Sequence, residues 1–245
     1  MESAVYPKMV LYEEKHWLFR GKYDIVRALL DQRFPPSSGA RILDVGCATG
    51  YFAKTLLDAG YRVTAADTSR QALDYCRERG LADAIEADLS RLPFPDASFD
   101  VLLALDVIEH ISDDAAAVRE ISRVLAPGGI LIATVPAHPF LFSAQDRLVQ
   151  HRRRYTRRSF AEALSSGLKV ERLSFWNFLL SPLLYPSKVI FKFFPRLLGS
   201  GKNELDVASW LNAALYAVLS REAAMISRRD LPFGMALVVV ARKIE

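Results

Sequence analysis

The sequence has few cysteines and histidines and no long uninterrupted hydrophobic run. Its 245 residues include two cysteines, Cys47 and Cys76, and four histidines. Two cysteines in a chain of this length do not make a disulfide framework, so we expect free thiols in a reducing compartment, the cytoplasm. The longest apolar stretch, residues 173–194, is interrupted by prolines and a lysine. Because a membrane helix needs about 20 consecutive apolar residues, we predict no transmembrane segment.

A large excess of charge of one sign is also lacking. The chain has 32 Lys and Arg against 28 Asp and Glu, and the net charge of +4 does not by itself indicate a nucleic-acid partner. The first residues lack the basic start and apolar run that are typical of a signal peptide. Hydrophobic residues make up 51% of the chain, which is enough for a folded core. The length suits one α/β domain, or a domain with a sizeable insert.

Strand-like and helix-like segments alternate between residues 41 and 135. Short apolar strands are predicted at residues 41–45, 62–66, 84–87, 99–105 and 130–135, and helices at residues 51–59, 70–79 and 113–125. This alternation predicts βαβ units, and therefore a parallel sheet with helices on both faces. Outside this region we predict helices at residues 16–34, 159–166 and 205–227, an extended segment at residues 169–175 and a last buried strand at residues 235–241.

The first predicted strand leads into a turn that contains Gly46 and Gly50. Such a turn lets the backbone approach a ligand closely and directs the amides of the following helix toward a polar group. Its Gly-x-x-x-Gly spacing differs from the Gly-x-Gly-x-x-Gly of dinucleotide-binding folds. Either glycine could instead serve only the turn, so the interpretation depends on the neighbouring residues.

Acidic residues accompany the first three predicted strands. Asp44 lies within the first strand, Asp67 follows the second and Asp88 follows the third. In an open α/β sheet, an acid about 20 residues beyond the turn, as Asp67 is, can accept hydrogen bonds from both ribose hydroxyls of a nucleotide. Asp88 is placed to meet an adenine edge, and Leu105 ends the fourth strand at the crevice where such sheets bind ligands. The alternative interpretation of Asp67 and Asp88 is that they are helix N-caps.

These features occur together in an order that is typical of one family. Residues 42–50, 66–67, 87–88, 92–94, 98–100 and 123–129 resemble the motifs of the class I S-adenosylmethionine-dependent methyltransferases. The resemblance covers roughly residues 41–135 and implies S-adenosylmethionine as the cofactor. It also implies a Rossmann-like, doubly wound α/β fold, with a mostly parallel seven-stranded sheet whose one antiparallel strand is residues 235–241.

The resemblance implies roles for individual positions. The predicted cofactor site comprises Asp44, Gly46, Cys47, Gly50, Asp67, Thr68, Asp88, Leu89 and Leu105. In the family's pattern the first four residues surround the methionine part of the cofactor. Asp67 holds the ribose, Asp88 meets the adenine amine, and Leu105 lies near the methionine amino group.

Candidate catalytic bases are few, and we predict four catalytic residues around the histidines. His151 is favoured because it shares an irregular segment with Asp146 and Tyr155. His110 follows the fourth strand and should face the crevice, although it could instead cap the next helix or bond the backbone. Glu109 and His110 together are similar to a metal-binding variant within the wider family. No second histidine adjoins that pair, so we predict no metal.

Six arginines lie between residues 147 and 158. Their guanidinium groups suit an anion clamp for phosphate or carboxylate, and the alternative is a solvated basic surface. Residues 145–155, with residues 16–20 and 231–234, resemble a methyltransferase subgroup of sugar and lipid-linked saccharide pathways. We therefore predict a small-molecule or lipid-linked acceptor, bound by Arg154, Trp17 and Trp176. Nucleic acid is disfavoured because no aromatic platform adjoins the arginines.

Residues 1–40 are predicted to form an N-terminal helical lid on a methyltransferase domain of residues 41–245, with residues 176–233 as a helical insert on the substrate side. The insert fits an apolar lid, a peripheral membrane contact, or helices that complete a core or dimer interface. The predicted function is methyl transfer to an oxygen of the acceptor. The alternatives are an RNA methyltransferase that uses the arginines, or a non-catalytic, cofactor-binding, membrane-associated partner protein.

Overall fold

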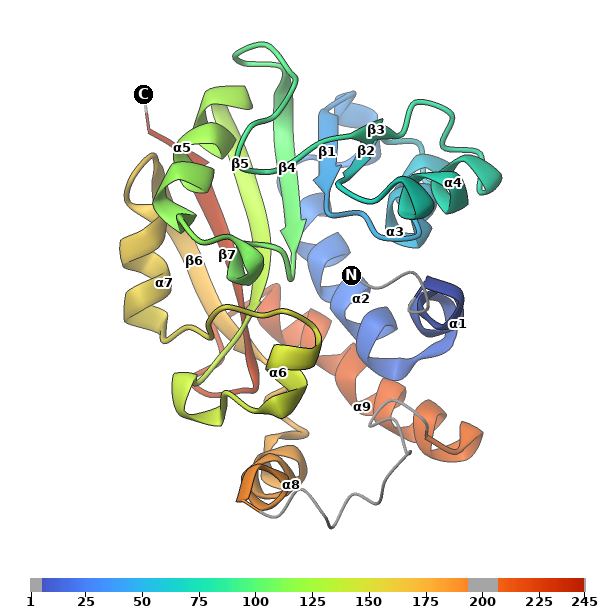
Figure 1. Cartoon of the computed structure of the whole chain (residues 1–245), viewed down its shortest axis with the longest axis vertical. Coiled ribbons are helices and arrows are strands. Elements are labelled where there is room, and N and C mark those ends of the chain that lie inside the picture. The colour runs from blue at the N-terminus through green and yellow to red at the C-terminus, as the bar shows by residue number, and fades with distance from the viewer. Residues whose placement is uncertain (1–5, 194–206, 245) are drawn as a thin grey trace.

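The computed structural model describes residues 6–193 and 207–244, which form an α/β fold around one twisted sheet (Figure 1). The strands are β1 (Arg41–Val45), β2 (Arg62–Asp67), β3 (Ile85–Glu86), β4 (Phe99–Leu105), β5 (Leu125–Pro136), β6 (Leu168–Trp176) and β7 (Ala236–Lys243). They make a seven-stranded sheet in the order β3-β2-β1-β4-β5-β7-β6. Strands β1 to β5 pair in parallel, whereas β7 is antiparallel to both β5 and β6. The predicted fold class is confirmed, including the antiparallel last strand.

Helices cover both faces of the sheet. They are α1 (Tyr6–Lys15), α2 (Trp17–Asp31), α3 (Tyr51–Asp58), α4 (Arg70–Glu78), α5 (Asp114–Val124), α6 (Ala144–Leu148), α7 (Arg157–Leu164), α8 (Ser181–Phe193) and α9 (Ser209–Ile226), with short 3₁₀ turns η2 (Pro36–Ser38), η3 (Ile108–His110) and η4 (Pro139–Leu141). One apolar core packs α5 and α7 against the sheet, and a second core packs α2, α3 and α9 against its other face (Figure 1). Burial on both faces explains why β5 and β7 read as continuous apolar runs.

The N-terminal segment differs from its prediction. We predicted one helix at residues 16–34, but the structure has two helices, α1 and α2, that meet at His16. His16 has extended backbone angles, and its ring accepts a hydrogen bond from the amide of Leu18, so it caps α2. The amphipathic pattern of residues 16–34 therefore corresponds to α2 alone. Helix α1 is a separate helix that precedes it.

The predicted insert is described only in part. Within it, α8 follows β6, and α9 packs along α2 on the far side of the sheet from α5 (Figure 1). Residues 194–206, which include the start of the helix predicted at residues 205–227, lie outside the described residues, as do residues 1–5 of the predicted lid. Across the described ranges, no helix combines the length and the apolar character that crossing a membrane requires.

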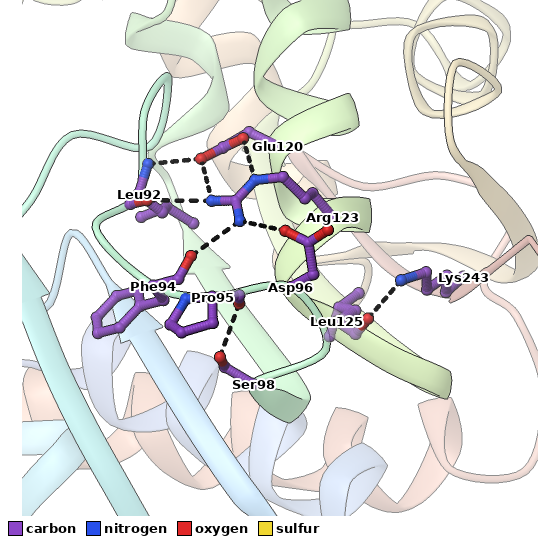
Figure 2. Close-up of polar contacts among 9 residues, drawn as sticks. All are labelled: Leu92, Phe94, Pro95, Asp96, Ser98, Glu120, Arg123, Leu125 and Lys243. Atoms are coloured by element: carbon purple, nitrogen blue, oxygen red, sulfur yellow. Dashed lines mark hydrogen bonds and ion pairs between the residues drawn. The ribbon is translucent and has the colours of Figure 1, made fainter.

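One of the motifs that resemble the family has a structural role outside the crevice (Figure 2). Arg123 of α5 donates through its Nη1 atom to the carbonyl of Phe94 and to Asp96, at 2.8 and 2.7 Å, and through Nη2 to the carbonyl of Leu92 at 3.1 Å. Glu120 completes the network by accepting from Arg123 and from the amide of Leu92. Arg123 thereby holds the segment that leads into the amino end of β4, at the end of the strand opposite to the crevice.

Candidate functional site

A cavity of about 260 Å³ lies at the carboxyl ends of β1 to β4, covered by α1 and α2. Of the predicted cofactor residues, all but Gly50 line it: Asp44, Gly46, Cys47, Asp67, Thr68, Asp88, Leu89 and Leu105. They come from four strand ends, so the parallel sheet alone brings them together. The remaining wall comes from the N-terminal helices and from the segment after β4.

The two glycines of the first turn have different roles. Gly46 has a φ of +70°, a backbone conformation that favours glycine, and a Cβ there would lie only 2.4 Å from the Val107 side chain. A larger residue at this position would therefore strain the turn and clash with Val107. Gly50 has a φ of +76°, and a Cβ there would meet Cys76 at 2.7 Å. Gly50 therefore allows α3 to begin against α4 and does not touch the cavity.

Asp67 connects the first turn to the end of β2. Its two carboxylate oxygens accept hydrogen bonds from the amides of Ala48, at 3.0 Å, and Ser69, at 2.9 Å. Ser69, not Asp67, is the N-cap of α4. Since each carboxylate oxygen accepts more than one hydrogen bond, Asp67 retains acceptor capacity toward the cavity. Asp88 likewise makes a local turn, with its side chain accepting from the amide of Ser90 at 2.7 Å.

Two buried carboxyl groups, those of Asp44 and Glu13, lie side by side in this part of the cavity lining. Asp44 is 3% exposed, and burial together with the nearby Glu13 raises its pKa from 3.8 to about 7. Glu13 projects from α1, is itself buried, and accepts hydrogen bonds from the amide and the hydroxyl of Thr49. Burial also raises the pKa of Glu13. Helix α1 is thereby tied to the glycine turn, and it adds a carboxylate that our sequence reasoning missed.

An ion pair between a buried lysine and a half-buried aspartate in the cavity lining was also missed. Lys22 of α2 donates to Asp106, just beyond β4, at 2.9 Å, and Asp106 also accepts from Thr134 at 2.8 Å. The sequence carried a signal for Lys22, because this lysine falls on the same helical face as the buried residues Ile25 and Leu29. A charged side chain at a core position of an amphipathic helix indicates a buried partner.

The residues predicted to bind the acceptor do not come together at the cavity. Trp17 and Trp176 are 7% and 3% exposed and belong to the core between the sheet and α9. Phe19 of α2, rather than Trp17, lines the cavity. Arg154 is engaged inside the protein, where it donates to Asp146 at 2.8 Å and to the carbonyl of Ala137 at 3.2 Å.

The predicted catalytic residues fall into two groups. His151 Nδ1 lies 2.9 Å from Asp146 Oδ1, and the His110 and His151 rings are in edge contact with centroids 4.9 Å apart. His110 lines the cavity, so His151 and Asp146 stand directly behind that wall. Tyr155 is different: it is buried in the core and its hydroxyl donates to Asp114 at 2.8 Å. Tyr155 therefore anchors its loop to α5 and is away from the cavity.

The reason we gave for predicting no metal is wrong. A second histidine does adjoin Glu109 and His110, because the loop after α6 brings His151 beside them. The Nε2 atom of His151 lies 3.7 Å from a carboxylate oxygen of Glu109, which is completely buried. Backbone contacts fix this approach, since the amide of Arg152 donates to the carbonyl of Glu109 at 2.9 Å.

Comparisons with known proteins agree with this geometry. Residues 43–133 match the sequence profile of a family described as a methyltransferase domain. A Mycolicibacterium smegmatis protein, described as a probable S-adenosylmethionine-dependent methyltransferase, is 36% identical over 127 residues, which are 51% of this chain and 48% of that protein. The malonyl-[acyl-carrier protein] O-methyltransferase of Serratia marcescens is 39% identical over 95 residues, 38% of this chain and 37% of that protein. The crystal structure of the [4+2]-cyclase SpnF is similar at a TM-score of 0.58 and 25% identity, and the match covers 90% of this chain and 81% of that one.

Residues 43–133 therefore form a methyltransferase domain that is similar to those of the class I S-adenosylmethionine-dependent methyltransferases. The cofactor of this family is S-adenosylmethionine. The match to the family profile contains the strand ends that line the cavity and stops at residue 133. The chain also spans only about half the length, or less, of the curated relatives that it matches. The loop that carries Asp146 and His151 lies beyond the matched residues, so its chemistry must be argued from this chain.

Proposed function

We propose that this protein transfers the methyl group of S-adenosylmethionine to an oxygen of a small-molecule or lipid-linked acceptor. The observation that carries the proposal is the cavity, where the strand-end residues Asp44, Asp67 and Asp88 line one space with the open backbone of Gly46. In the proposed arrangement Asp67 accepts from the ribose hydroxyls, Asp88 meets the adenine amine, and Asp44 faces the methionine part.

The charge of the cavity supports this proposal. S-adenosylmethionine carries a positive sulfonium and a positive amino group, and the cavity lining holds five carboxylates (Glu13, Asp44, Asp67, Asp88 and Asp106) against one lysine, Lys22. Fixed negative charge in a partly buried site attracts a cation more strongly than the same charge does in water. Methyl transfer neutralises the sulfonium, so such a site should hold the cofactor more tightly than its product.

The acceptor enters, we propose, at the wall formed by His110. This residue borders the cofactor cavity, with His151 and the buried Glu109 directly behind it. A hydroxyl acceptor gains from a group that polarises or removes its proton, typically about 10²–10⁴-fold in rate. His110 and His151 would supply that activation. Asp146 acts as a positioning residue, because its hydrogen bond sets the orientation of the His151 ring.

A lipid-linked acceptor is supported by the apolar surface near α8. Leu183 and Ile190 of this helix are 65% and 47% exposed, and Phe140 of η4 is 51% exposed. Phe140 also contacts Tyr185 with ring centroids 5.8 Å apart, so η4 and α8 form one surface. Helices α6 and α8 lie at the end of the sheet to which β4 points, the end that carries the cavity (Figure 1). An acyl or isoprenoid chain could rest there while its polar end enters the site.

Calorimetric titration with S-adenosylhomocysteine tests the central claim. We expect micromolar binding to the wild-type protein and an affinity at least about 30-fold lower in Asp67→Ala, since hydrogen bonds to a charged group contribute about 1.5–3 kcal/mol each. Asp67→Asn, which retains one acceptor oxygen and therefore one of the two turn contacts, should lie between the two.

The matched control is Asp83→Ala, which removes an exposed carboxylate close to β3 but outside the cavity. This variant should bind as the wild type does. If a folded wild-type sample shows no binding, or if Asp67→Ala and Asp83→Ala behave alike, the proposed function fails.

A further inference from the structure

The side chain of Glu109 is unusual among the carboxylates of this protein. It is completely buried, yet neither carboxylate oxygen has a hydrogen-bond partner among the residues that the structure describes. A buried carboxylate without partners is costly to keep in a fold. A positively charged ligand beside this side chain would stabilise its ionised form.

The two histidines beside Glu109 are oriented by hydrogen bonds at Nδ1. His110 Nδ1 lies 3.1 Å from the carbonyl oxygen of Gln150, which can only accept, so His110 Nδ1 carries the proton. His151 Nδ1 lies 2.9 Å from Asp146. Both oxygens of Asp146 already accept from groups that can only donate, Oδ1 from Arg154 Nε at 2.8 Å and Oδ2 from the amide of Ser143 at 2.8 Å. Asp146 is therefore an acceptor, and His151 Nδ1 also carries the proton.

This tautomer leaves a lone pair on the Nε2 atom of each neutral histidine. A carboxylate or backbone carbonyl that orients Nδ1 is the arrangement typical of histidines that ligate metal ions. One ligand atom from each of Glu109, His110 and His151 lies within 4.8 Å of the others. Atoms bound to one ion at about 2.1 Å stand roughly 3–3.5 Å apart, so movements of about 1 Å would complete the coordination.

We propose that Glu109, His110 and His151 form a binding site for a divalent transition-metal ion next to the cofactor cavity. Two imidazole nitrogens and one carboxylate favour Zn²⁺, Fe²⁺, Co²⁺ or Mn²⁺ over Ca²⁺ or Mg²⁺, which prefer oxygen ligands throughout. Three protein ligands leave coordination positions open on the ion. Since His110 borders the cavity, those positions face the proposed acceptor site.

The use of such an ion in catalysis rests on the proposed function, whereas the binding of the ion does not. An ion at this place would take an oxygen atom of the acceptor as a further ligand and lower the pKa of that hydroxyl. Acceptors with a free hydroxyl beside a second oxygen atom are the class best suited to it, because two adjacent oxygens can fill two open positions. His151 would then act as a ligand to the ion.

The test is a titration of the tag-free, chelator-treated full chain with Co²⁺, followed by visible absorption and then by displacement with Zn²⁺. Neither cofactor nor acceptor is present, so the result is independent of methyl transfer. We expect a saturable band at one Co²⁺ per chain that Zn²⁺ abolishes. Asp146→Asn, which leaves all three ligands in place but changes the hydrogen bond that orients His151, should weaken binding about 10–100-fold. Glu109→Gln and His151→Gln remove ligands and should weaken it at least as much.

The chain offers a matched control in Glu222→Gln. Glu222 is also a completely buried glutamate with an unpartnered oxygen, but it lies on α9, where it accepts from the amide of Leu179. Its variant should bind Co²⁺ as the wild type does, and circular dichroism establishes that each variant is folded. The proposal is overturned if the wild type gives no band, or if Glu109→Gln and Glu222→Gln bind Co²⁺ equally.

Discussion

Asp44 illustrates how a single residue can serve ligand binding at the expense of stability. It lies in a buried strand beside Glu13, and burial raises its pKa to about 7. In the folded protein Asp44 therefore keeps its proton over a pH range in which the unfolded chain has lost it. The folded state gains from this proton below pH about 4, and the gain is lost as the pH rises toward 7.

We predict that Asp44→Asn stabilises the ligand-free protein at pH 8 and has little effect at pH 4. The expected difference is about 1–4 kcal/mol in the free energy of unfolding, with the upper end given by about 1.4 kcal/mol per pKa unit. Urea denaturation at several pH values measures it. At pH 8, where Asp44 is ionised, the same variant should bind S-adenosylmethionine more weakly, because it removes a negative charge from the cavity.

The exposed Asp83→Asn serves as the control for this prediction, and its stability should follow the wild-type pH dependence. If Asp44→Asn has the same stability relative to the wild type at pH 4 and pH 8, the role given to Asp44 is incorrect.

Among the elements, the pair α2 and α9 decides how the N-terminal helices are placed over the cavity. Their contact is close at Gly21, where an added Cβ would meet Leu219 Cδ2 at 2.3 Å. Polar contacts support the same pair, since Asn212 accepts from the amide of Trp17 at 2.8 Å and Tyr216 donates to Asp24 at 2.9 Å. Helix α9 thus holds α2, and α2 holds Lys22 at the cavity.

We predict that Gly21→Ala lowers the free energy of unfolding by about 1–3 kcal/mol, the usual cost of overpacking a core. This loss should occur even though alanine is intrinsically better than glycine inside a helix by about 1 kcal/mol. Urea denaturation of Gly21→Ala, Leu219→Ala and the double variant completes the measurement. In the double variant the shortened side chain should relieve the clash, so its destabilisation should be smaller than the sum of the single effects. Strictly additive effects would show that the two residues are not in contact.

For the molecule as a whole, the six arginines between residues 147 and 158 decide between two classes of partner. Arg152 donates to the carbonyl of His110 at 2.9 Å, and Arg153 donates to the carbonyl of Ser112 at 2.6 Å. Arg153, Arg154 and Arg158 form ion pairs with Asp114, Asp146 and Glu162. Three of the six arginines are therefore paired with carboxylates in the part of the chain that the structure describes, and Arg152, Arg153 and Arg154 position the loop that carries His151.

We predict that the protein is not retained on RNA in about 50 mM salt, conditions under which a phosphate-binding protein loses little affinity. Filter binding with a structured RNA measures this. Retention that weakens with salt, and weakens further when Arg147 and Arg157 are both replaced by alanine, would instead support the RNA methyltransferase alternative.

Local patterns in the sequence determined the sheet and the cofactor half of the site. The carboxyl ends of parallel strands lie at the same edge of the sheet, whatever path the loops take. The sequence alone therefore predicted that Asp44, Asp67 and Asp88 lie close together. The antiparallel last strand came from the resemblance to the family, and the structure confirms it. The boundary at His16 was missed because helical periodicity does not reveal where one helix ends and another begins.

Only the tertiary structure decided which residues complete the site. Lys22 and Asp106 are 84 residues apart in the chain, and Glu13 and Thr49 are 36 apart. Glu109 and His151 meet because a long loop folds back onto η3. Such contacts depend on loop paths and on how α1 and α2 pack, neither of which has a periodicity that the sequence displays. The sequence by itself therefore indicated the cofactor, through its resemblance to the family, and the packing of distant segments decided which other groups line the cavity.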